Sequence, residues 1–271
     1  MDNRPIGIFD SGLGGLNGLR AVRRFLPQEN IVYFADSGRL PYGAKSRSQL
    51  RGMAEQDLAF LSSFNVKAIL IACGTLSSNA GDILERWPIP TVGVLASSAD
   101  WMHRLDGNGP IAVIATEASI RSGSYQKALG AACPGREIIA VACPDFVPLI
   151  ESGHCAPDDP AVQDAVARYL LPAREANADA LLLGCTHYDI IEAAIARFIG
   201  QDTTLVSAAE SGAAALCSML LKEKRTGGSG ETRFYTSGDV VEFSAAASLF
   251  LGCDPAEIQA EAVSPQPIPE V

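Results

Sequence analysis

Two cysteines stand at matching places in this chain, and a pair of thiols is well suited to acid–base chemistry. Cys73 ends the stretch N-V-K-A-I-L-I-A-C, and Cys185 ends the similar stretch N-A-D-A-L-L-L-G-C. An earlier stretch is repeated too, because I-G-I-F-D-S at 6–11 is echoed by I-A-V-I-A-T at 111–116. Each half therefore runs from an opening strand to a strand that ends in cysteine. Two halves related by an approximate twofold axis would present their thiols to one ligand from opposite sides.

The segment around Cys185 reads A-L-L-L-G-C-T-H-Y-D from Ala180 to Asp189. Its apolar residues suit a buried strand, and Gly184 lets the chain turn sharply at the strand's end. Thr186, with an acidic residue three positions later, predicts the N-terminal cap of a helix. A cysteine between a strand and a helix start lies near unpaired N–H groups, which favour a thiolate and attract anions. The segment therefore predicts a reactive thiol beside an anion site.

The glycine-rich stretch D-S-G-L-G-G-L-N-G-L follows the first predicted strand, at 6–9. A dinucleotide-binding fingerprint that begins at Gly12 would need glycine at position 17, where the chain has Asn17. The loop still places Asp10 and Ser11 at the carboxyl end of a strand, where open α/β sheets bind their ligands.

Predicted strands alternate with predicted helices along most of the chain, which indicates parallel sheets covered by helices on both faces. We expect a late strand at 233–236 and a helix at 240–251 to return to the sheet of the first half. The proline-rich stretch at 264–271 is expected to be a flexible tail. The expected strands are 6–9, 31–35, 66–72, 90–95, 138–143, 180–183, 204–206 and 233–236, with the echo strand starting at 111.

Composition limits the function. The chain has 271 residues, which is enough for about two domains. Its net charge is −10 and it contains no basic run, so nucleic acids and anionic membranes are not expected as partners. It has no signal-peptide core and no apolar run of membrane-spanning length. Seven cysteines without a C-x-x-C pair predict reduced thiols in the cytoplasm. Five of them have no counterpart in the repeat and are expected to be packing or surface residues: Cys133, Cys143, Cys155, Cys217 and Cys253.

Longer motifs carry a resemblance that covers nearly the whole chain. They are F-D-S-G-L-G-G-L at 9–16, Y-F-A-D-S-G-R-L-P-Y-G at 33–43, S-G-S-Y-Q at 122–126, C-P-D-F-V-P-L-I-E at 143–151, G-C-T-H-Y at 184–188 and F-Y-T-S-G-D at 234–239. With these motifs the chain resembles the glutamate racemases, the cofactor-independent enzymes of the aspartate/glutamate racemase superfamily.

The resemblance implies two similar parallel-sheet α/β domains related by pseudo-twofold symmetry, with the active site in the cleft between them. The domains would be 1–97 with 207–263, and 98–206. Cys73 and Cys185 would be the two catalytic bases. The further residues implied as catalytic are Asp10, His187, Glu151 and Asp36, and those implied to bind substrate are Asp10, Ser11, Pro41, Tyr42, Gly43, Gly74, Thr75, Thr186 and His187.

The implied reaction interconverts L- and D-glutamate and supplies the D-enantiomer for peptidoglycan. Inversion at an α-carbon removes a proton from one face and delivers one to the other, so one base must be charged while its counterpart holds a proton. Two thiolates across one small ligand repel each other, so the pair tends to share a single proton. The scheme requires no metal and no organic cofactor. The expected partner is the amino-acid substrate; the sequence leaves the oligomeric state open, and a homodimer is one candidate.

Departures from the family pattern keep other functions open. The family's first cysteine motif reads C-N-T, whereas here Gly74 removes an amide that would contact the substrate. Racemisation of another amino acid such as aspartate is one alternative, and a binding or regulatory protein that has lost catalysis is another. A Cys–His hydrolase leaves the second cysteine unexplained. A zinc site lacks the close ligand spacing that zinc sites show.

Overall fold

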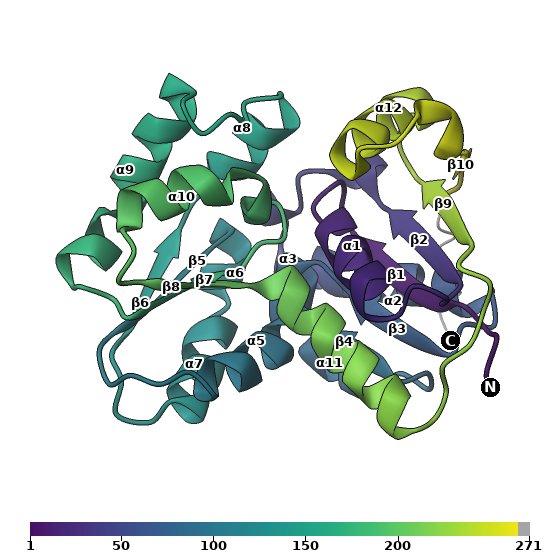
Figure 1. The fold of residues 1–271 in the computed structure, drawn as a ribbon, viewed down its shortest axis with the longest axis horizontal. Helices are drawn as coiled ribbons and strands as arrows, with labels where there is room; N and C mark the ends of the chain where they lie inside the picture. The colour runs from purple at the N-terminus through teal and green to yellow at the C-terminus, as the bar shows by residue number, and fades with distance from the viewer. Residues whose placement is uncertain (265–271) are drawn as a thin grey trace.

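The computed structural model describes residues 1–264, and its strands form two parallel sheets that lie side by side (Figure 1). The first sheet has the order β10-β9-β2-β1-β3-β4 and the second β6-β5-β7-β8. The predicted fold class, two parallel-sheet α/β units, is confirmed. The strands are β1 (Ile6–Asp10), β2 (Ile31–Ala35), β3 (Ala68–Ile71), β4 (Thr91–Gly93), β5 (Ile111–Ala115), β6 (Ile138–Ala142), β7 (Ala180–Leu183), β8 (Thr204–Ser207), β9 (Thr232–Thr236) and β10 (Ala260–Ala262).

Helices cover both faces of each sheet (Figure 1). They are α1 (Leu16–Phe25), α2 (Arg47–Ser62), α3 (Gly74–Asn79), α4 (Gly81–Arg86), α5 (Val94–His103), α6 (Glu117–Arg121), α7 (Ser124–Ala132), α8 (Phe146–Glu151), α9 (Pro160–Glu175), α10 (Glu192–Ile199), α11 (Ala208–Lys222) and α12 (Val240–Leu251). Four 3₁₀ turns complete the described elements: η1 (Ser37–Arg39), η2 (Tyr42–Ala44), η3 (Tyr188–Ile191) and η4 (Pro255–Glu257).

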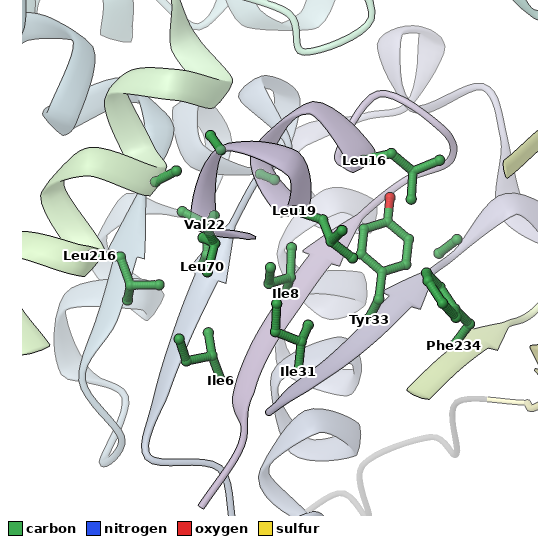
Figure 2. Close-up of a cluster of buried hydrophobic side chains, with 14 of the residues drawn as sticks. Ile6, Ile8, Leu16, Leu19, Val22, Ile31, Tyr33, Leu70, Leu216 and Phe234 are labelled. Atoms are coloured by element: carbon green, nitrogen blue, oxygen red, sulfur yellow. The ribbon is translucent and has the colours of Figure 1, made fainter. Parts of the chain in front are cut away.

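The first sheet is apolar on both faces, as a parallel sheet between helices must be. Ile8 of β1 lies opposite Tyr33 of β2 and Leu70 of β3. These residues point to the face covered by α1 and α11, where Figure 2 shows them packed with Val22 and Leu216. Side chains alternate across a strand, so the next residue along β1, Phe9, packs on the other face with α2. Both faces hold β1 and β3 rigidly, and their carboxyl ends point to one edge.

The second sheet is built in the same way. Ile114 of β5 and Leu183 of β7 are paired in register and pack with α8, α9 and α10. Val113 and Leu182, one position earlier, pack on the opposite face with α5 and α7. Because β5 and β7 are fully buried, the turns that follow them start from fixed points.

The chain crosses between the sheets more than once. Helix α5 follows β4 of the first sheet and leads to β5 of the second, and α11 leads back from β8. Strand β9 then pairs with β2, so the predicted return of the 233–236 strand to the first sheet is confirmed. The domain boundaries at 97, 98, 206 and 207 remain a prediction. Apart from Ser264, the predicted tail lies outside the described residues.

Helical runs are interrupted at two places. Gly123, whose φ of 71° is left-handed, separates α6 from α7. Ala80, which has non-helical angles, separates α3 from α4. Glu151 is the last residue of α8; that helix tolerates Pro148 because the first turn needs no partner for its N–H groups.

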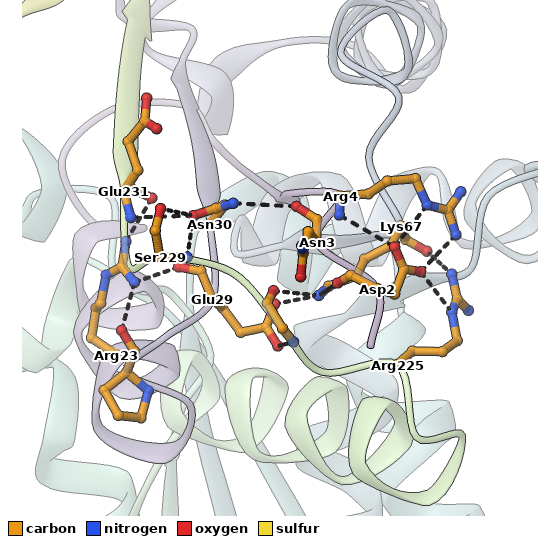
Figure 3. A network of polar contacts seen from close by, with 12 residues as sticks. Asp2, Asn3, Arg4, Arg23, Glu29, Asn30, Lys67, Arg225, Ser229 and Glu231 are labelled. Atoms are coloured by element: carbon orange, nitrogen blue, oxygen red, sulfur yellow. Dashed lines mark hydrogen bonds and ion pairs between the residues drawn. The ribbon is translucent and has the colours of Figure 1, made fainter.

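A polar network fixes the opposite edge of the first sheet, where its strands begin (Figure 3). Lys67 and Glu29 form an ion pair whose side chains are both buried. The Lys67 ammonium also donates to the Asp2 carbonyl at 2.7 Å, and Arg225 donates to the Lys67 carbonyl at 2.5 Å. Removing one partner of such a pair costs about 3–5 kcal/mol, since the other charge is left uncompensated. The network ties the amino terminus and the segment after α11 to β3.

Candidate active site

A cavity of about 230 Å³ lies where the carboxyl ends of both sheets meet. It is bordered by the residues that follow β1 and β3 of the first sheet and β5, β6 and β7 of the second. Cys73 and Cys185 both line it. The other lining residues are Asp10, Ser11, Leu40, Pro41, Tyr42, Gly43, Ala44, Gly74, Thr75, Thr116, Glu117, Cys143, Pro144, Val147, Pro148, Thr186 and His187.

Cys73 lies two residues after β3, at the N-cap position of α3. It is 3% exposed, and its Sγ donates to the Ser11 hydroxyl at 3.8 Å. Burial raises the pKa of the Cys73 thiol, and the nearby carboxylate of Asp10 raises it further. Cys73 therefore favours its protonated form at neutral pH.

Cys185 lies two residues after β7 and is followed by an irregular turn. Its Sγ is 3.9 Å from Nδ1 of His187, whose Nε2 is 2.6 Å from Oε1 of Glu151. Burial opposes the charge of His187, but its hydrogen bonds with Cys185 and Glu151 dominate and raise its pKa well above 6.5. The sulfur of Cys185 therefore has an imidazolium beside it.

Asp10 ends β1 between the two cysteine segments. Its carboxylate accepts from the Gly12 N–H at 2.9 Å and from the Thr186 hydroxyl at 3.3 Å. Burial raises the pKa of Asp10, while the charge of His187 opposes that shift. The predicted helix cap at Thr186 is wrong: the chain forms η3 before α10, and the Thr186 hydroxyl is used by Asp10, far along the chain.

The 41–43 segment forms one wall of the cavity, and a buried polar cluster supports it. Tyr42 lines the cavity, and its hydroxyl donates to Asp36 and, at 3.4 Å, to Asp57. Asp36 also accepts from Arg39 at 2.5 Å and from Ser237 at 2.6 Å. The structure thus places Asp36 behind Tyr42 and not among the lining residues; Glu151, likewise, reaches the cavity through His187.

Comparisons with known proteins identify the family of this chain. The model of the Asp/Glu/Hydantoin racemase family matches residues 19–216. The chain belongs to this family. A glutamate racemase from Desulforudis audaxviator is 37% identical over 265 residues, covering 94% of this chain and 96% of that protein. One from Beutenbergia cavernae is 38% identical, with coverages of 93% and 91%.

Solved structures show the same likeness over the full length. A glutamate racemase isoform from Bacillus anthracis superposes with a TM-score of 0.90 at 31% identity, covering 97% of this chain and 98% of that one. The glutamate racemase of Francisella tularensis, solved with D-glutamate, gives a TM-score of 0.88 at 36% identity and the same coverages. This member of the family is an amino-acid racemase.

Sequence reasoning missed several lining residues of this racemase. Thr116 could have been found, because it matches Ser11 in the repeat; its hydroxyl lies 2.9 Å from that of Thr75. Cys143 was expected to be a packing or surface residue, and it is fully buried, but it also lines the cavity. Its position directly after strand β6 was the sequence signal that could have identified Cys143 as a lining residue. The remaining missed residues are Leu40, Ala44, Glu117, Pro144, Val147 and Pro148.

Residues 1–264 contain no group of three or more His, Cys, Asp or Glu side chains arranged to hold a metal ion. None of the helices in the same range is both long and apolar enough to cross a membrane. The described lining of the cavity includes neither lysine nor arginine. An anionic ligand there would be bound by backbone N–H groups, by hydroxyls and by His187.

Proposed function

We propose that this racemase interconverts L- and D-glutamate by two-base proton transfer, with Cys73 and Cys185 as the bases. The observation that carries the proposal is that both sulfurs line one cavity from the ends of corresponding strands, β3 and β7. Glutamate is supported as the substrate by relatives at 37% and 38% identity and by the Francisella tularensis structure with D-glutamate.

The surroundings of the two sulfurs determine which cysteine holds a proton at the start of the reaction. The raised pKa of Cys73 keeps its proton on the thiol, and the imidazolium of His187 balances negative charge on Cys185. In one direction the Cys185 thiolate takes the α-proton and the Cys73 thiol protonates the opposite face of the carbon. The product then leaves behind a protonated Cys185 and a charged Cys73, which is the arrangement that the reverse reaction needs.

The charge that develops on the substrate needs donors fixed in advance. Gly74, at the start of α3, and Ser11, in the loop after β1, line the cavity, and each carries a backbone N–H group. The hydroxyls of Ser11, Thr75, Thr116 and Thr186 line the same cavity. We assign substrate carboxylates and the carbanion-like transition state to these groups.

The remaining predicted residues take supporting roles in this proposal. Asp10 and His187 touch the cavity and assist Cys73 and Cys185 with their protons. Glu151 orients His187, and Asp36 orients Tyr42. The D-glutamate formed would serve peptidoglycan synthesis in the cytoplasm. A homodimer remains part of the proposal, and light scattering of the purified chain tests it.

The experiment is an amino-acid panel in deuterated water. L-Glutamate should racemise, and deuterium should appear at its α-carbon at a comparable rate. L-Aspartate, L-alanine and L-glutamine serve as the comparison substrates. Neither optical change nor α-deuteration with L- or D-glutamate would reject the proposal.

Gly74 favours a second candidate, racemisation of a different amino acid, because the family's amide is missing at that position. Turnover of aspartate or another panel member above that of glutamate would support it. A non-catalytic binding role would instead give substrate-dependent stabilisation without any α-deuteration.

A further inference from the structure

The two cysteine segments touch through their backbones at Gly74 and Gly184. A Cβ built on Gly74 would lie 2.0 Å from the Gly184 carbonyl oxygen and 3.2 Å from its carbonyl carbon. Contacts of real Cβ atoms below 3.0 Å are essentially never seen. Gly74 has no left-handed φ, so glycine is needed here for space and not for backbone conformation. The carbonyl of Gly184 occupies the place of a side chain at position 74.

The Gly184 carbonyl cannot easily move away. Tyr125, which is fully buried, donates to it at 2.8 Å. On the other side Gly184 lies against β5, since a Cβ there would be 2.9 Å from the Ile114 carbonyl and 3.2 Å from the Ala115 Cβ. The same Tyr125 hydroxyl would lie 3.1 Å from a Cβ on Gly74. Tyr125 therefore holds one segment in position against the other.

Helix α3, which Gly74 begins, is equally fixed. All six of its residues are buried. Its Ser78 hydroxyl donates to Ser119 at 3.1 Å, and the Ser78 carbonyl accepts from Ser124 at 2.6 Å. These contacts join α3 to α6 and α7 of the other sheet. A side chain at position 74 could therefore be accommodated only if the two cysteine segments move apart.

We propose that Gly74 is a positioning residue that sets how closely the Cys73 and Cys185 segments approach, with Tyr125 holding the Gly184 carbonyl that it meets. The proposal rests on the proposed function for its effect on turnover. Relief of the 2.0 Å contact to 3.0 Å requires a displacement of about 1 Å. A misplacement of about that size costs on the order of 100-fold in rate. Restoring the family's asparagine at this position should therefore damage this racemase.

The experiment compares Gly74→Ala and Gly74→Asn with a control, Gly81→Ala. Position 81 lies at the start of α4, has nothing within 4 Å of a Cβ built on it, and is not among the residues that line the cavity. Racemisation of glutamate is followed by circular dichroism, and amide hydrogen exchange is followed by mass spectrometry for peptides spanning 73–79 and 183–188. Melting curves verify that each variant is folded.

We expect both Gly74 variants to lose about 100-fold in kcat, with faster exchange in both peptides, while Gly81→Ala matches the wild type. Tyr125→Phe, which keeps the ring and removes the donor, tests the same contact without a clash. It should slow turnover and speed exchange only in the 183–188 peptide.

Wild-type turnover in either Gly74 variant would overturn the proposal. Loss of turnover without faster exchange in the 183–188 peptide would overturn it too, because Gly74 would then act through the substrate and not through Gly184. The exchange measurement does not depend on activity. If the wild type racemises no amino acid, the proposed function fails, while faster exchange in Gly74→Ala still supports the contact.

Discussion

Cys73 and Cys185 end corresponding strands of the two sheets, yet the side chains around them differ in kind. Cys73 is at the N-cap position of α3, next to a hydroxyl, Ser11, and close to the carboxylate of Asp10. Cys185 is followed by an irregular turn, and its neighbour is the imidazolium of His187, paired with Glu151. One sulfur lies near a carboxylate, which disfavours negative charge, and the other lies beside a cation.

The difference shows that the repeat determines where the sulfurs are but not how they are charged. The positions of the sulfurs are set by the buried strands β3 and β7, which correspond to each other in the two halves. The charges near the sulfurs come from residues that have no charged counterpart in the other half. The residue that matches Asp10 in the repeat is Ala115, which has no charge to offer Cys185. The two thiols should therefore respond unequally to changes in their neighbours.

The largest effect is expected from the thiols themselves. Cys73→Ser and Cys185→Ser should each reduce kcat by about 10²–10⁴-fold, the contribution typical of one acid–base group. Racemisation assays by circular dichroism measure it. Cys253→Ser, at a partly exposed cysteine away from the cavity, is the control and should remain active. A single cysteine variant that still turns over normally would mean that one base suffices.

Asp10→Asn tests the effect of the carboxylate that lies near Cys73. Asparagine keeps an acceptor for the Gly12 N–H but removes the charge that raises the pKa of Cys73. We expect about 100-fold slower turnover from the lost acid–base group. The pKa of Cys73 should fall, so the loss of its proton should appear at lower pH in iodoacetamide labelling of the Cys185→Ser background. Labelling with an unchanged pH profile would show that Asp10 does not act on Cys73.

Sequence periodicity was enough to predict strands β1 to β9 and the placement of both cysteines, since buried apolar runs and the repeat are local signals; the short strand β10 was not predicted. Several partners of the functional side chains could not be predicted, because they come from distant segments, as Glu151 does for His187. Asp36 was predicted as a catalytic residue, and the structure surrounds it with Arg39 and Ser237 behind Tyr42. Thr186 was predicted to cap a helix, and its hydroxyl instead bonds to a residue of the other sheet.

Gly74 is the clearest example of a contact that the sequence does not predict. In the sequence it is only the loss of an amide from a familiar motif. In the structure it is the point at which one cysteine segment meets the backbone of the other. No pattern within either segment contains that information, because the space at position 74 is set by β5 and Tyr125 of the second sheet.

Glu151→Gln tests the effect of the His187 imidazolium that lies beside Cys185. Its carboxylate helps to raise the pKa of His187 above 6.5, so glutamine should lower that pKa. Because the imidazolium is lost as pH rises through the pKa, the alkaline decline of kcat/KM should begin at lower pH in the variant. A moderate loss of about tenfold at neutral pH is expected, within the range for a hydrogen bond to a charged group. Profiles of kcat/KM across pH measure both.

The matched control is Asp159→Asn, which alters the exposed pair of His154 and Asp159, 2.7 Å apart and outside the cavity. Its profile should coincide with that of the wild type. The raised pKa of His187 also makes the free energy of unfolding depend on pH. Its stabilising contribution is fully present below pH 6.5 and is lost as pH rises through the pKa of the folded state. An alkaline limb that does not move in Glu151→Gln would contradict the assignment of His187.

The smallest effect is expected at Ser11 and Thr116, which match in the repeat and differ in what they bind. The Ser11 hydroxyl accepts from the Cys73 sulfur, whereas the Thr116 hydroxyl contacts Thr75 and, at 3.0 Å, Ser119. Ser11→Ala removes a hydroxyl that can rotate to donate to the Cys73 thiolate and so lowers the pKa of Cys73. We therefore expect kcat to fall by about two- to tenfold, as one hydrogen bond allows. Thr116→Val touches no sulfur and should change KM more than kcat. Equal losses of kcat in the two variants would mean that the halves support their bases in the same way, against the asymmetry described above.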